Sequence, residues 1–276
     1  MLVRKYSNGC GALVTGIDLA RFSEGERHDV WKAFLEHGVL FFQDQRLTPE
    51  DHIAFARRFG EIVINEFFPE STSHKEIAEV RKEKEQRTNI GGGWHADHSY
   101  DPDPALGSIL VARELPEAGG DTMFANMYAA YDSLSDGLKR TLATLRARHS
   151  NKHLYGEGGF YRKSDLGAQL KTDGVVSEAV HPVVITHPDS GRKALYVNPG
   201  HTLHFEGWSR PESQSLLQYL YTHATQPELT CRFRWTPGAV AFWDNRCSWH
   251  YAINDYHGSR RLMHRITLAG VSLGAQ

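Results

Sequence analysis

The chain has 276 residues, of which 40% are hydrophobic and 23% charged, and its formal net charge is -2. This near balance of charge gives no electrostatic footprint for nucleic acid or for an anionic membrane surface, so small-molecule chemistry is the favoured class of function. The length suits one catalytic domain spanning residues 1–276, which can bury a core of its own.

Cysteine use and the N-terminal segment indicate the compartment. The three cysteines, Cys10, Cys231 and Cys247, form no CxxC pair and no even framework, which favours a reducing environment. The first residues lack the apolar stretch of a signal peptide, and no run of about 18 apolar residues exists to span a bilayer. We therefore expect a cytoplasmic protein without a membrane partner.

Helix signals open the chain. The capping box of Ser23 and Glu26 predicts a helix that ends at Gly38, and a strand is expected directly after it over Val39–Phe42. Thr48, followed by proline at the first helical position, predicts a second helix that ends at a glycine, Gly60. A third helix is predicted by the capping pair Ser209 and Glu212 and the leucines that follow it.

Short runs rich in β-branched and aromatic residues, separated by turn residues, predict strands in the second half of the chain. They are His181–Thr186, Ala194–Val197, Thr230–Trp235, Ala239–Trp243 and Arg265–Val271. Many short strands with a few outer helices predict a mainly β fold with flanking helices, arranged as a jelly-roll-like double sheet.

Two polar stretches interrupt this pattern, Glu70–Gly93 and Ser150–Glu178. Long connections in a compact domain are usually lids or disordered segments, so we expect lid-like insertions around residues 65–93 and 150–178. The charge run Lys75–Arg87 is expected to form a solvated face.

A metal site is suggested by His95, Asp97 and, far downstream, His250. In an extended segment, residues two apart point to the same face, so His95 and Asp97 can reach one ion. Two histidines and one carboxylate form the facial ligand set of non-haem iron(II) oxygenases, which leaves positions open for an organic acid and dioxygen. The alternative is chance, because the chain has 16 histidines and a lone His250 is more often a packed core residue.

Two arginines follow the third candidate ligand. If residues 261–265 form a strand, Arg261 and Arg265 share one face, and two buried guanidiniums are costly unless anions neutralise them. This pattern predicts an acidic cosubstrate on Arg261 and an acidic primary substrate near Arg265. The alternative is that one arginine, Arg265 above all, pairs with an internal Asp or Glu.

Four motifs in order give a family resemblance. They are Trp94–Asp97, Gly119–Thr122, Trp243–Arg246 with His250–Ala252, and Arg260–Arg265. Together they resemble the taurine dioxygenase and phenoxyacetate dioxygenase family, from about Gly9 to Gly270. The resemblance implies an iron(II)- and 2-oxoglutarate-dependent dioxygenase with a double-stranded β-helix (jelly-roll, cupin-like) core, and a homo-oligomer, either dimer or tetramer.

The resemblance also implies roles for individual residues. His95, Asp97 and His250 would be the catalytic iron ligands, while Arg261 and Thr122 would bind the distal carboxylate of 2-oxoglutarate. Dioxygen would be consumed, a small organic anion hydroxylated, and succinate and carbon dioxide released. The carboxylate of Asp97 favours hydroxylation, since related halogenases have a small residue there to make room for halide.

The substrate side departs from taurine dioxygenase. Arg265 corresponds to the arginine that binds the sulfonate of taurine, but Asn65, Phe68 and His201 replace other residues of that family's pocket. With Tyr155, these residues are the expected substrate-binding set, and the less polar side chains favour a sulfonate, a sulfate ester or an aryloxyalkanoate. Ordinary packing is the alternative for Phe68, Tyr155 and His201. Two other functions stay open: a metal protein that only binds or senses a small anion, and a zinc-dependent hydrolase.

Overall fold

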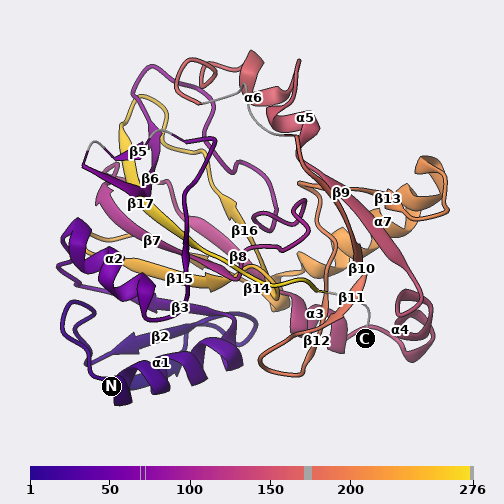
Figure 1. The fold of residues 1–276 in the computed structure, drawn as a ribbon, viewed down its shortest axis with the longest axis horizontal. Helices are drawn as coiled ribbons and strands as arrows, with labels where there is room; N and C mark the ends of the chain where they lie inside the picture. The colour runs from indigo at the N-terminus through magenta and orange to yellow at the C-terminus, as the bar shows by residue number, and fades with distance from the viewer. Residues whose placement is uncertain (69, 72, 171–175, 274–276) are drawn as a thin grey trace.

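The computed structural model describes residues 1–68, 70–71, 73–170 and 176–273. Its largest element is a nine-stranded sheet with the order β1-β2-β3-β15-β7-β17-β6-β5, with β4 paired to β17 (Figure 1). All pairs in this sheet are antiparallel except β2 with β3. Its strands are β1 (Leu2–Lys5), β2 (Ala12–Thr15), β3 (Val39–Phe42), β4 (Ile62–Val63), β5 (Glu70–Ser71), β6 (His74–Lys82), β7 (Gly107–Glu114), β15 (Val240–Asp244) and β17 (Arg261–Leu268).

Three smaller sheets complete the β structure of the described residues. They are β14 (Thr230–Phe233), β8 (Thr122–Asn126) and β16 (Ser248–Ala252); β10 (Glu178–Pro182), β9 (Arg146–Ser150) and β13 (Thr202–Phe205); and β11 (Val184–Thr186) with β12 (Lys193–Leu195). The helices are α1 (Glu24–His37), α2 (Pro49–Arg57), α3 (Met127–Asp132), α4 (Asp136–Leu142), α5 (Lys152–Tyr155), α6 (Phe160–Lys163) and α7 (Arg210–Ala224), with a 3-10 turn over Pro227–Leu229. None of the helices in the described part of the chain has the length and apolarity needed to cross a lipid bilayer.

Strand alternation gives the large sheet two apolar faces. In β3, Leu40 and Phe42 pack in the cluster that includes residues of α1 and α2, whereas Phe41 packs on the opposite face. The ring of Phe41 stacks on Phe233 of β14 at a centroid distance of 4.2 Å and meets Phe124 of β8 edge-on. The β14-β8-β16 sheet therefore faces the large sheet across a shared core, to which β17 contributes Met263.

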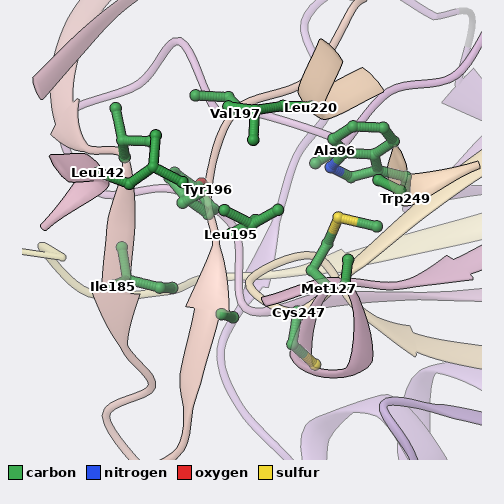
Figure 2. Packing of buried hydrophobic residues seen from close by; sticks show 14 of the residues in the cluster. Ala96, Met127, Leu142, Ile185, Leu195, Tyr196, Val197, Leu220, Cys247 and Trp249 are labelled. Atoms are coloured by element: carbon green, nitrogen blue, oxygen red, sulfur yellow. The ribbon is translucent and has the colours of Figure 1, made fainter. Parts of the chain in front are cut away.

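A third apolar cluster lies beside the β9 and β12 strands and helix α7. Figure 2 shows Ala96 next to Trp249 in this cluster, together with Leu220 of α7 and Met127 of α3. Ala96 and Trp249 are only 2% exposed. Because neighbouring side chains in an extended segment point to opposite faces, burial of Ala96 turns the residues on either side of it away from this core.

Several predicted elements are confirmed. Helix α1 has the Ser23–Glu26 capping box and ends at Gly38, whose φ of 69° is the left-handed conformation that glycine adopts without strain. Strand β3 spans the predicted residues, and both Thr48 and Ser209 are N-caps with a complete capping box.

Other boundaries were wrong. Helix α2 ends at Arg57 rather than Gly60, and β17 covers Arg261–Leu268 rather than Arg265–Val271. The predicted strand over residues 181–186 is two strands in two different sheets.

The prediction for the charge run Lys75–Arg87 was also wrong in its first half. Strand β6 occupies His74–Lys82 within the large sheet, and Ile77 and Lys82 are buried. The charged residues at the less buried positions of this strand made the whole segment resemble a solvated face, so its buried positions were not recognised in the sequence. Parts of the two expected insertions, residues 69, 72 and 171–175, lie outside the described residues.

Candidate active site

A short backbone pairing brings the candidate metal ligands together. His95 and His250 form an isolated antiparallel bridge in which each N–H donates to the other's carbonyl, at 3.1 and 2.9 Å. Paired residues point to the same face, and their imidazole centroids lie 4.1 Å apart. Asp97, two residues on from His95, points to this face as well, because Ala96 points into the core.

The three side chains converge on one point. Asp97 lies 3.6 Å from Nε2 of His95 and 3.7 Å from Nε2 of His250, and the ligand atoms of all three residues lie within 4.8 Å of one another. These separations exceed ordinary hydrogen-bond lengths but are short enough for one ion to touch all three residues. Two nitrogen donors and one carboxylate suit a first-row divalent metal.

Neighbouring groups orient these ligands. Nδ1 of His95 lies 2.7 Å from the carbonyl oxygen of Gly93, so its N–H donates a hydrogen bond to that oxygen. Nε2 then carries the lone pair that can bind a metal. The hydroxyl of Ser108 donates to Asp97 at 3.2 Å. Burial lowers the pKa of His250 well below its usual value, as does the proximity of His95. The imidazole is therefore held in the neutral form that metals bind.

Arg265 lies directly beside this group. Its Nη1 atom is 3.4 Å from both carboxylate oxygens of Asp97, and both side chains are 8% exposed. Burial raises the pKa of Asp97, but nearby positive charge, above all that of Arg265, outweighs this effect, so the net pKa lies below its usual range. The alternative expected for Arg265, an ion pair with an internal carboxylate, is therefore observed. Its partner is Asp97, which is itself a candidate metal ligand.

A cavity of about 450 Å³ opens over this group. Seven of the sequence-predicted residues line it, whereas Thr122, His250 and Arg261 do not. The seven are Asn65, Phe68, His95, Asp97, Tyr155, His201 and Arg265.

Several aromatic side chains form part of the cavity wall. The guanidinium of Arg265 lies 5.0 Å from the ring centroid of Phe68, and Tyr155 stacks on Phe67 at 4.2 Å. His201 is 4% exposed and packs edge-to-face with Tyr100, with ring centroids 4.8 Å apart. This wall suits an apolar body attached to an anionic group.

Asn65 holds the backbone of two neighbouring cavity residues in place. Its Oδ1 accepts hydrogen bonds from the N–H groups of Phe67 and Phe68, at 2.9 and 3.0 Å. Its Nδ2 is buried without a hydrogen-bond partner among the described residues. The side chain therefore orients the two phenylalanines and keeps one donor available.

Arg261 and Thr122 meet at a second place, joined by Trp235. The indole N–H of Trp235 donates to Oγ1 of Thr122 at 3.0 Å, and the Trp235 ring lies 5.8 Å from the Arg261 guanidinium carbon. Arg261 is 4% exposed, and its Nε and Nη2 atoms have no hydrogen-bond partner among the described residues. Burial lowers the pKa of Arg261. A buried guanidinium with free donors suits an organic carboxylate.

A second buried group, His187, Asp244 and Cys247, also has metal-type donor atoms close together. Arg246 occupies both oxygens of Asp244, at 2.9 and 2.7 Å, and His187 lies 3.0 Å from the same carboxylate. Because these contacts use the carboxylate fully, this group is a structural ion-pair network.

Sequence reasoning missed three residues that shape the site: Ser108, Trp235 and Phe67. Ser108 could have been found as a lone hydroxyl within the apolar run of β7, since buried hydroxyls require partners. No local signal distinguishes the roles of Trp235 and Phe67 from ordinary core packing.

Comparison with known proteins gives consistent matches. A family profile described as "Taurine catabolism dioxygenase TauD, TfdA family" matches residues 2–267. The (S)-phenoxypropionate/alpha-ketoglutarate-dioxygenase of Sphingobium herbicidovorans is 38% identical, covering 94% of this chain and 92% of the relative. The alkylsulfatase of Acinetobacter baylyi is also 38% identical, covering 99% of this chain and 86% of the relative.

Solved structures agree with these matches. The crystal structure of AAD-2 in complex with Mn(II) and N-oxalylglycine is 32% identical, with a TM-score of 0.80 and full coverage of both chains. This neighbour carries a divalent metal and a small organic ligand.

Proposed function

Because the chain belongs to the TauD/TfdA family of dioxygenases, we propose that His95, Asp97 and His250 are the iron(II) ligands of its active site. The enzyme is a 2-oxoglutarate-dependent dioxygenase that uses iron(II), 2-oxoglutarate and dioxygen. The ligand assignment rests on the convergence of these three side chains, whose ligand atoms lie within 4.8 Å of one another, and two of them, His95 and Asp97, line the cavity.

We propose that Arg261 and Thr122 bind the distal carboxylate of 2-oxoglutarate. Two free donor atoms on a buried guanidinium support this assignment, because the carboxylate would satisfy both at once. The Thr122 hydroxyl accepts from Trp235 and keeps its own proton for donation.

The primary substrate is proposed to be a small organic anion with an apolar body, either a sulfate ester, a sulfonate or an aryloxyalkanoate. Arg265 would bind the anionic group, and the free Nδ2 donor of Asn65 belongs to the same cavity. Phe68, Tyr155 and His201 would contact the body of the substrate. Related proteins are named for phenoxypropionate, alkyl sulfate and sulfate ester chemistry, which fits this division of the cavity.

Bound iron(II), with 2-oxoglutarate and dioxygen, supplies the oxidising power for hydroxylation and releases succinate and carbon dioxide. The protein's own residues hold and orient the reactants. Arg261 and Arg265 fix two anions on the same inward face of β17, and the aromatic wall excludes water from the reacting bond.

We also propose a double-stranded β-helix core in one catalytic domain, with residues 65–93 and 150–178 as lid-like insertions. The facing sheets on either side of the Phe41 cluster support this arrangement. A cytoplasmic location and a homo-oligomer, either dimer or tetramer, are proposals that fractionation and mass measurement in solution can test.

The test is a substrate panel scored by succinate release. Sulfate esters, sulfonates and aryloxy acids are incubated with iron(II), 2-oxoglutarate and oxygen, and one class should release succinate in step with its own product. Tight 2-oxoglutarate binding without succinate formation on any substrate would support a binding or sensing protein. Turnover that persists without oxygen would support a zinc-dependent hydrolase.

A further inference from the structure

Lys82 is a buried lysine close to the active site. It ends strand β6, is 2% exposed, and its Nζ donates to Oδ1 of Asn254 at 2.6 Å. The ammonium also lies 4.4 Å from the ring centroid of Tyr256 and 3.5 Å from Nδ1 of His257. It forms no ion pair with a carboxylate among the described residues, although a buried ammonium is normally paired with one.

The position of Lys82 in the large sheet places a second buried cation next to it. Lys82 pairs directly with Arg261 in the register of β6 and β17, so both cationic side chains leave the sheet on the same inward face. Burial lowers the pKa of Lys82, and the charge of Asp165 offsets this only in part. An apolar residue would cost less at position 82, so the charge calls for an explanation other than packing.

The contacts of Lys82 lead to the wall of the substrate cavity. Asn254 lines that cavity, and its Nδ2 donates to the carbonyl oxygen of Arg87 at 2.7 Å. Asn89 donates to the carbonyl oxygen of Ala252 at 2.8 Å, and Ala252 N–H donates to Gly91 at 2.9 Å. The strap formed by residues 252–254 is therefore bonded to residues 87–91, which line the cavity just before His95.

The same loop reaches the proposed cosubstrate site. Tyr256 follows Asn254 by two residues, and its ring lies 6.0 Å from the guanidinium carbon of Arg261. Lys82 thus contacts Asn254 on the substrate side and Tyr256 on the cosubstrate side.

We propose that Lys82 is a positioning residue, which holds the strap 252–254 against residues 87–91 so that the cavity wall is rigid when substrate is bound. This inference rests on the proposed function of the cavity. A loosened wall would leave the substrate poorly placed while 2-oxoglutarate still binds Arg261, so cosubstrate and dioxygen would be consumed without matching hydroxylation, with the second oxygen atom reduced to water by ascorbate added to the assay.

The first test compares Lys82→Met with wild type and with Lys84→Met, whose lysine is exposed. Methionine keeps the apolar stem and removes the charge, so the variant should fold with a thermal midpoint no lower than that of wild type. Losing one charge-assisted hydrogen bond should lower the product-to-succinate ratio about ten-fold and raise the substrate KM, with a much smaller change in the 2-oxoglutarate KM. Lys84→Met should behave as wild type, and Lys82→Arg should restore part of the ratio.

A second variant, Asn254→Ala, tests the same contact from its other side. It should lower the ratio at least as much as Lys82→Met, and the double variant should be no worse than Asn254→Ala alone, because that change already removes the contact with Lys82 as well as the bond to Arg87. An unchanged ratio in Lys82→Met, or full additivity in the double variant, would overturn the proposal.

Hydrogen exchange separates this proposal from the proposed function, because it needs no substrate. In Lys82→Met, backbone amides of residues 87–93 and 250–254 should exchange faster than in wild type, while those of β15 should not change. Unchanged exchange in the first two segments would contradict the positioning role even if no substrate has been identified. Absence of succinate formation by the wild-type enzyme, in contrast, would count against the proposed function alone.

Discussion

The guanidinium of Arg265 lies 3.4 Å from both carboxylate oxygens of Asp97, in a site where both side chains are 8% exposed. The residue proposed to bind the substrate anion thus contacts a proposed metal ligand. A metal ion bound by Asp97 would take up much of the carboxylate's charge and leave Arg265 free to attract a second anion. The arrangement links metal loading to substrate binding.

Arg265→Met should weaken binding of the anionic substrate. Because hydrogen bonds to charged groups contribute about 1.5–3 kcal/mol, the substrate KM should rise roughly 10- to 100-fold. Steady-state kinetics with varied substrate measures this KM. The KM of Arg265→Lys should lie between those of wild type and Arg265→Met, because lysine keeps the charge but lacks the planar guanidinium. A normal substrate KM in Arg265→Met would remove this residue from the substrate site.

Arg261→Met should abolish the stabilisation that 2-oxoglutarate gives the protein. Wild type should unfold at a higher temperature when 2-oxoglutarate is added at about 100 times its Kd, which corresponds to roughly 2.7 kcal/mol. The variant should show no such shift, and without cosubstrate it should be at least as stable as wild type because a buried unpaired charge is gone. An equal thermal shift in both proteins would refute the assignment.

Arg246→Met should destabilise the fold without touching the cavity. It leaves Asp244 fully buried with His187 as its remaining side-chain partner, and removing one member of a buried ion pair costs about 3–5 kcal/mol. Chemical denaturation measures this loss. The control is Arg57→Met, whose side chain is 62% exposed and pairs with Glu76, and which should change stability by about 1 kcal/mol or less. Equal effects would show that the Asp244 network is not structural.

The sequence predicts what depends on local chemistry. Capping residues such as Ser23 and Thr48 determine where helices begin, and alternation places Arg261 and Arg265 on the inward face of β17. The shared face of His95 and Asp97 likewise follows from a two-residue repeat.

Long-range relationships could not be derived in this way. Nothing local selects His250 as the partner of His95, because that choice depends on a bridge between distant segments. The same holds for Lys82, whose burial depends on its register with β17, and for the contact between Arg265 and Asp97. Strand β6 was missed because its outward charged residues resemble a solvated segment.

The most direct test of the metal site is anaerobic titration of iron(II) in the presence of 2-oxoglutarate. Wild type and a surface control, His28→Gln, should each bind one iron per chain and develop the weak visible band of a metal-bound keto acid, whereas Asp97→Ala should bind iron far more weakly and lack the band. Full iron binding with a normal band in Asp97→Ala, or no band in folded, iron-loaded wild type, would contradict the account.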